Sequence, residues 1–131
     1  MASRNPRPLS PHLTIWHWGP HMVVSILHRV TGAGLTVVGL AVLTWWLVAV
    51  AEGDKSFETF SGFARAPFGI LILVGLTWAF YQHLLSGIRH LSMDSGAAFE
   101  LPINRRFAIL TIVGAVILTA LTWALFLGVF E

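Results

Sequence analysis

Residues 81–94 read Tyr-Gln-His-Leu-Leu-Ser-Gly-Ile-Arg-His-Leu-Ser-Met-Asp and continue the apolar segment Phe68–Phe80 without a helix breaker other than a single glycine. A helix advances about 100° per residue, so two histidines, that glycine and a carboxylate fall on one face. These residues are His83, Gly87, His90 and Asp94, and the face extends backwards through Gly75 and Ala79. Ionisable groups are costly inside a membrane, so this face predicts a functional site directed toward protein or cofactor.

The composition supports a membrane location for this segment. Of 131 residues, 56% are hydrophobic and 11% are charged, whereas about a quarter are charged in soluble domains. The chain has no cysteine, which excludes disulfides, thiolate metal sites and iron–sulfur ligation by its own residues. The formal net charge of +2 is too small an excess to indicate nucleic-acid binding.

Three apolar segments are long enough to cross a membrane, since a hydrocarbon layer of about 30 Å requires ~20 helical residues. We therefore expect an all-α membrane protein with transmembrane helices at about 22–51, 67–91 and 107–130. These helices form one transmembrane anchor domain, 22–131, after an N-terminal arm, 1–21. The arm is polar and contains several prolines, so it resembles neither a secretory signal nor a mitochondrial transit peptide.

The basic residues predict the orientation in the membrane. They gather in the arm and in the connection between the second and third helices, while the other side holds only Lys55 and Arg65. The positive-inside rule then places the N-terminus in the cytoplasm and the C-terminus in the periplasm. Residues 52–66 carry phenylalanines at helical spacing among charges, a pattern compatible with a short interfacial helix or with a loop.

The first apolar segment carries a polar cluster of its own. Ser25, His28 and Arg29 stand at helical spacing, and small residues that permit close helix packing continue the same face. These small residues are Gly32, Thr36 and Gly39. In the third segment, a stripe of small residues likewise predicts packing. That stripe consists of Ala120, Ala124 and Gly128.

The two polar clusters lie at similar depth. If the first helix enters hydrocarbon near Met22 and the second leaves it near Leu91, His28 and His83 each lie about 10 Å inside the cytoplasmic boundary. Basic groups nearer the surface are Arg29, Arg89 and His90. This arrangement suits haem, whose iron binds imidazole and whose carboxylates attract basic groups. From the residues alone, His28 and His83 are candidates for two axial ligands of one haem.

Three motifs in order resemble the cytochrome b anchor subunit of succinate dehydrogenase, respiratory complex II. The motifs are Arg7-Pro8-Leu9-Ser10-Pro11-His12-Leu13-Thr14-Ile15, Ser25-Ile26-Leu27-His28-Arg29-Val30-Thr31-Gly32, and His83 followed by Gly87-Ile88-Arg89-His90-Leu91 and Asp94. The resemblance extends to the length and the three helices, and so covers nearly the whole chain. The family often has tyrosine where this chain has Trp16.

The resemblance implies a subunit that, with a second, smaller membrane anchor, holds one haem b. The two anchors tether an iron–sulfur subunit and an FAD-bearing flavoprotein subunit, so succinate is oxidised on another chain and this chain has no catalytic residue. By resemblance, His83 is an axial ligand of the haem iron, and the smaller anchor supplies the other. Ser25 and Arg29 match the quinone-site residues, with ubiquinone as the expected quinone. His28, Arg29 and His90 match residues near the haem propionates.

The expected role is therefore electron transport to quinone in the respiratory chain, within the tricarboxylic acid cycle enzyme. The expected location is a bacterial inner membrane rather than a mitochondrial one, with the lipid bilayer and the other subunits as partners and no nucleic acid. The alternative function is a haem-free structural membrane anchor for a respiratory dehydrogenase. A transporter is disfavoured because the ionisable groups gather at one end of the helices.

Overall fold

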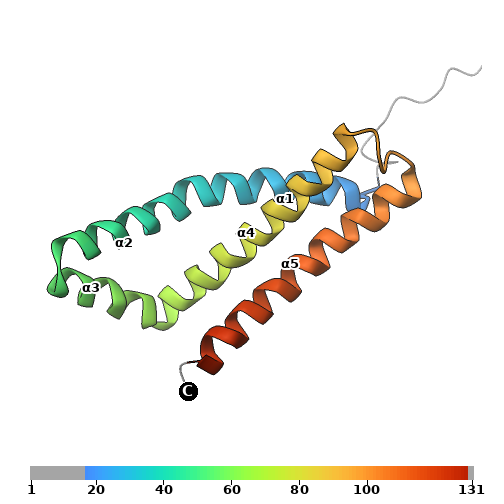
Figure 1. Ribbon diagram of the computed structural model, residues 1–131. Coiled ribbons are helices and arrows are strands. Elements are labelled where there is room, and N and C mark those ends of the chain that lie inside the picture. Colours follow the sequence, from blue (N-terminus) through green and yellow to red (C-terminus); the bar gives the residue numbers. More distant parts are fainter. Residues whose placement is uncertain (1–16, 130–131) are drawn as a thin grey trace, which may run out of the picture.

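The computed structural model describes residues 17–129, so most of the predicted arm, residues 1–16, lies outside the described residues. Six helical segments follow one another along the chain (Figure 1). They are α1 (Pro20–Gly34), the π-helix η1 (Leu35–Gly39), α2 (Leu40–Glu52), α3 (Asp54–Arg65), α4 (Pro67–Asp94) and α5 (Leu101–Val129). No strand occurs between residues 17 and 129, which confirms the all-α class.

Three helices are long and apolar enough to cross a membrane, as predicted. They are Pro20–Glu52, which joins α1, η1 and α2, then Pro67–Asp94 and Leu101–Gly128. The third begins at Leu101 rather than at the predicted Phe107, so it includes Arg105 and Arg106. Pro102 does not prevent this early start, because the first helical turn has no use for the N–H that proline lacks.

The connection between the first two membrane helices was expected to be either a short helix or a loop. It is helical, as α3. Gly53, with a φ of 99°, makes the turn between α2 and α3 in a conformation that favours glycine. The aromatic ring of Trp45 on α2 contacts Phe60 and Phe63 on α3, with ring centroids 5.1 and 5.0 Å apart. Helix α3 thus folds back along α2 before the chain enters α4 (Figure 1).

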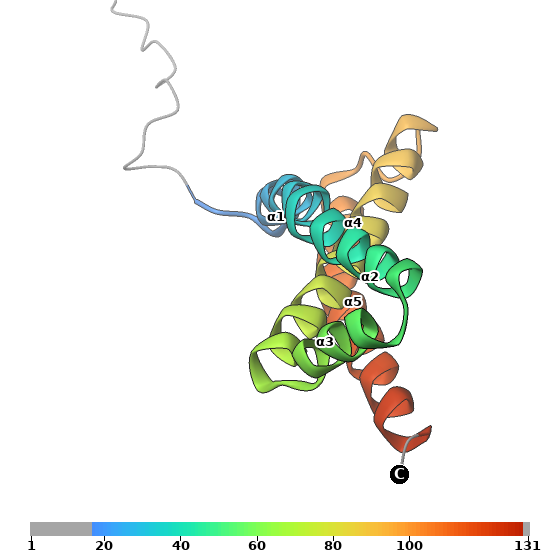
Figure 2. The same cartoon turned by 90° about the vertical axis from the view of Figure 1, so that its left-hand side faces the viewer.

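Helix α4 packs against both α1 and α5 and lies between the first membrane helix and α5 (Figure 1). Figure 2 views the molecule from the end where α2 turns into α3. Small and short polar side chains dominate the buried contact, which lets the helices approach closely. The buried residues are Val24 and Thr31 on α1, Ala79, Gln82, Ser86 and Arg89 on α4, and Ala108, Thr111, Ala115 and Thr119 on α5. The predicted stripe Ala120, Ala124 and Gly128 is exposed and does not pack against α1 or α4, so its packing stays a prediction.

Gly69 lies at the tight junction of α3 and α4, and Gly69→Ala is expected to destabilise the protein. A Cβ at this position would collide with the backbone carbonyl oxygen of Phe63, which cannot move aside as a side chain can. Overpacking of this kind costs about 1–3 kcal/mol, and a thermal melt of the purified protein should show a lower Tm. Gly75→Ala is the matched control, because nothing lies within 4 Å of a Cβ there. Equal melting temperatures for the two variants would contradict this description of the junction.

Candidate functional site

Three histidines meet where α1 and α4 pack together. The rings of His28 and His83 stack with centroids 4.0 Å apart and planes 5° from parallel. His90, two turns after His83 on α4, approaches His28 edge-on at 5.3 Å and 60°. All three side chains are half-buried, so the cluster has a packed side against the bundle and a side that is open to a neighbour.

A backbone hydrogen bond defines the tautomer of His83. Its Nδ1 lies 3.1 Å from the carbonyl oxygen of His28. A carbonyl only accepts, so Nδ1 carries the proton and donates it. The lone pair of the ring therefore lies on Nε2. Histidines that bind a metal ion almost always donate their other ring N–H to a carbonyl, a carboxylate or water in this way.

His28 is in turn fixed by a buried serine. Its Nδ1 lies 2.8 Å from Ser86 Oγ, and that hydroxyl donates to the carbonyl of Gln82 at 2.6 Å. Because the serine proton is used in that bond, His28 Nδ1–H is the donor to Ser86 Oγ. Ser86 is fully buried, so the chain of contacts from Ser86 through His28 to His83 starts in the packed interior of the bundle.

A glycine makes room for the histidine stack. A Cβ on Gly32 of α1 would lie 2.9 Å from Cε1 of His83, closer than real Cβ atoms come. Thr31, the residue before it, is buried, and its hydroxyl lies 3.4 Å from His83 Nδ1 while donating to Leu27 O at 2.7 Å. The π-helix η1 begins three residues after Gly32, and such segments occur frequently at functional sites.

The other predicted site residues lie on α1 beside this cluster. Ser25 is half-buried and Arg29 is exposed, four residues apart on the same helix. No hydrogen bond within the described part of the chain links either side chain to the histidines. Arg29 is therefore directed outward, toward the space that a neighbouring chain, lipid or small molecule would occupy.

Arg89 was expected, with Arg29 and His90, among the basic groups near the membrane surface that could attract haem carboxylates. The structure places it elsewhere. It is only 5% exposed, and its Nη2 donates to Oδ1 of Asn104 at the start of α5. Asn104 Nδ2 also contacts Met93 Sδ at 3.1 Å. Arg89 thus joins α4 to α5 on the packed side of α4. Asp94, at the end of the predicted polar face, is exposed.

The buried polar residues Gln82 and Ser86 were missed from the sequence. Both are fully buried, and within residues 17–129 the side-chain amide of Gln82 has no hydrogen-bond partner. With Arg89 they stand four and three residues apart, a helical stripe that could have indicated the packed face. The sequence predicted instead the neighbouring face with His83, Gly87 and His90, and these residues are only half-buried.

The geometry does not support His28 and His83 as two ligands of one haem. Axial ligands lie on opposite sides of a porphyrin with a ring nitrogen directed at the iron. Parallel rings 4.0 Å apart leave no space for a macrocycle between them. Among residues 17–129, no set of three or more His, Cys, Asp or Glu side chains is arranged to hold a metal ion.

The fold and the cluster together define a membrane protein with three membrane-crossing helices and a half-buried histidine cluster between α1 and α4. Residues 3–122 match the family model of the succinate dehydrogenase/fumarate reductase transmembrane subunit. The chain is 38% identical over 125 residues to the succinate dehydrogenase cytochrome b556 subunit of Paracoccus denitrificans, covering 95% of each chain. It is 35% identical over 119 residues to the subunit of the same name from Rickettsia conorii, covering 91% of this chain and 92% of that one.

A mitochondrial relative is more distant. The succinate dehydrogenase cytochrome b560 subunit of Sus scrofa is 34% identical over 101 residues, which are 73% of this chain and 57% of that protein. The chain belongs to the family of succinate dehydrogenase cytochrome b membrane-anchor subunits. It is thus a multi-pass membrane component of an oxidoreductase complex, as the sequence motifs indicated.

Proposed function

We propose that the chain binds haem b together with a second anchor subunit and contributes to a quinone-reduction site. The observation that carries this proposal is the hydrogen bond from His83 Nδ1–H to the His28 carbonyl. It leaves Nε2 as the ligating atom and fixes the ring orientation, which is the arrangement that metal-bound histidines have. The relatives are named cytochrome b subunits, which supports haem as the cofactor.

The residues present fit one side of a haem pocket. His83 would hold the iron through Nε2, and His28, Arg29 and His90 would lie near the propionates, where basic groups stabilise carboxylates. His28 and His83 both have a free Nε2, but their parallel stack prevents them from binding one haem from its two sides, so the second ligand would come from the smaller anchor subunit. When bound, haem supplies a one-electron redox centre whose potential depends on its axial ligands and its burial.

Ser25 and Arg29 would form this chain's part of the quinone site. Quinone reduction takes up two electrons and two protons, and negative charge develops on the carbonyl oxygens. The Ser25 hydroxyl would donate a hydrogen bond to one carbonyl, and the exposed guanidinium of Arg29 would stabilise the charge. The electrons would come from succinate oxidised on the flavoprotein and would pass through the iron–sulfur subunit.

The basic residues support an orientation with the histidine end at the cytoplasmic face of a bacterial inner membrane. The arm, residues 1–21, would precede the anchor domain 22–131 on that side, where the two soluble subunits would be tethered. The complex purified with its partners should show a haem b spectrum and reduce ubiquinone with succinate. A purified complex that contains no haem would instead favour the haem-free structural anchor.

Ser86→Ala is expected to loosen the haem ligand without removing it. The variant loses the acceptor of His28 Nδ1–H, so the backbone carbonyl that orients His83 is held less firmly. Loss of such an outer partner typically weakens binding of the metal group about 10–100-fold. Haem content should fall, and the low-spin haem signal in electron paramagnetic resonance should broaden.

Ser92→Ala is the control for that substitution, because the Ser92 hydroxyl donates only to the carbonyl of Ile88 on its own helix. If Ser86→Ala binds haem as tightly as Ser92→Ala, with an unchanged resonance signal, the proposed role of Ser86 is wrong.

A further inference from the structure

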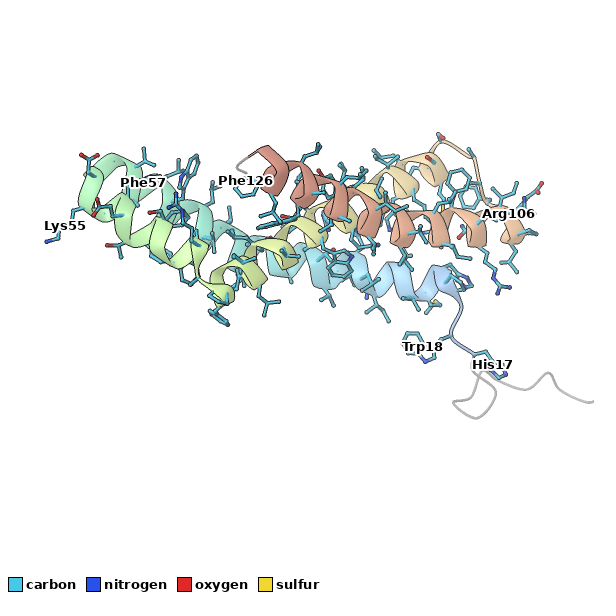
Figure 3. All side chains as sticks on the ribbon, turned by 90° about the horizontal axis from the view of Figure 1, so that it is seen from below. His17, Trp18, Lys55, Phe57, Arg106 and Phe126 are labelled. Atoms are coloured by element: carbon cyan, nitrogen blue, oxygen red, sulfur yellow. The ribbon has the colours of Figure 1, made fainter. Side chains whose placement is uncertain are left out.

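A basic pocket lies at the end of the bundle where α1 and α5 begin. Its volume is about 730 Å³, and α5 supplies Arg105, Arg106 and Ile109 while the start of α1 and the residues before it supply His17, Trp18 and His21. Figure 3 shows Arg106 at the same end of the molecule as His17 and Trp18, with Lys55 at the opposite end. None of Ser25, His28, Arg29, His83 or His90 lines this pocket, so it is separate from the histidine site.

The charge of the pocket favours an anion. Arg105 and Arg106 are both exposed, and no acidic residue is part of the lining. Neither arginine has an ion pair or a hydrogen-bond partner within residues 17–129. This differs from Arg89, whose guanidinium is used in the contact with Asn104. Two adjacent guanidinium groups can hold phosphate oxygens through several charge-assisted hydrogen bonds.

The remaining wall of the pocket is largely apolar and is formed where two membrane-crossing helices begin. Pro20 and Leu101, at the first residues of two membrane-crossing helices, belong to the lining, as does Ile109 two turns deeper along α5. Trp18 is 64% exposed, and tryptophan is enriched at the headgroup level of membranes. A ligand that fits this wall carries an anionic group at the boundary and hydrocarbon below it.

We propose that this pocket binds the phosphate of an anionic phospholipid, with the acyl chains lying along α5 toward Ile109. Basic pockets between membrane helices are known to recognise such head groups. A zwitterionic lipid would bring its own cation next to the two arginines and would bind more weakly. The proposal depends neither on haem nor on quinone binding.

The test uses the complex purified with its partner subunits and reconstituted in nanodiscs that contain equal amounts of phosphatidylglycerol and phosphatidylcholine. Native mass spectrometry then counts the lipids that remain bound after release from the disc. The double variant Arg105→Gln/Arg106→Gln removes both charges from the pocket. Lys55→Gln/Arg65→Gln removes two charges from the opposite end and is the matched control. Thermal melts and haem content establish that both variants are assembled.

The wild-type complex and the control should retain phosphatidylglycerol in preference to phosphatidylcholine. The pocket variant should lose that preference, with roughly 30-fold weaker retention if each basic residue contributes as it does near anionic membranes. Retention of phosphatidylglycerol by the pocket variant at the control level overturns the proposal. Equal retention of both lipids by the wild type also overturns it. A third contradicting result is that inorganic phosphate in detergent raises the Tm of the wild type but not of the pocket variant, while the wild type shows no lipid preference.

Discussion

Replacing His83 with alanine is expected to remove the haem b absorbance of the complex. Both His83 and His28 hold a hydrogen bond through Nδ1–H and have a free Nε2, and the resemblance to the family motif assigns the ligand to His83. If His83 holds the haem iron as proposed, its loss would remove this chain's ligand, which would weaken haem binding and alter the spin state of the iron. The reduced-minus-oxidised spectrum of the purified complex measures this directly.

His28→Ala is the control for that experiment. The hydrogen bond that orients His83 ends on the backbone carbonyl of His28, and alanine keeps this carbonyl. The variant loses the ring stack and the contact with Ser86, so its haem content should fall as in Ser86→Ala, but a haem b absorbance with a shifted potential should remain. If His28→Ala loses the haem and His83→Ala keeps it, the ligand assignment is reversed and the proposed site is wrong.

Replacing Arg29 with alanine should have the second largest effect, on the order of a 100-fold loss of succinate–quinone reductase activity, the loss typical for removing one stabilising donor. Ser25→Ala should lower the same activity by roughly tenfold, since a hydroxyl contributes less than a charged group. Succinate oxidation with an artificial acceptor should stay near the wild-type rate, because that reaction takes place on another chain.

Arg65→Ala provides the comparison, since it removes an exposed arginine at the end of α3 and should leave both activities unchanged. Equal loss of both activities in Arg29→Ala would indicate a failure of assembly. The assignment of Arg29 to the quinone site would then be wrong.

The sequence predicted the architecture well because the membrane imposes it. Three apolar segments of sufficient length have few alternatives to three helices, and the structure has them. The motifs also led to the correct family, since their order and spacing extend along nearly the whole chain. The start of α5 was missed because arginines are good helix formers and do not mark a helix boundary by themselves.

The sequence was less informative about which helix face packs. In water, polar residues mark the outside, but Gln82, Ser86 and Arg89 are buried here and many large apolar residues are exposed. Exposed leucine costs nothing in lipid, so hydrophobicity does not distinguish the packed face of a membrane helix. Small residues also do not specify which helix they pack against: Ala115 is buried within this chain, whereas Ala120 is exposed on it.

The histidine cluster was predicted in part. Helical spacing and depth were sufficient to expect His28 and His83 at one level, and the structure brings their rings into contact. The contact is a parallel stack, which spacing along two separate helices does not specify. The bond from His83 to the carbonyl of His28 likewise depends on the relative rotation of α1 and α4, set by contacts such as Ser86 and Gly32.

The ligand assignment can be observed directly in an electron cryo-microscopy map of the complete complex at a resolution that separates the imidazole rings. The proposed function predicts haem iron bonded to Nε2 of His83, with Nδ1 still donating to the His28 carbonyl and the second ligand on the partner anchor. Haem bonded to His28, a haem with both axial ligands from this chain, or no haem at the α1–α4 contact would contradict it.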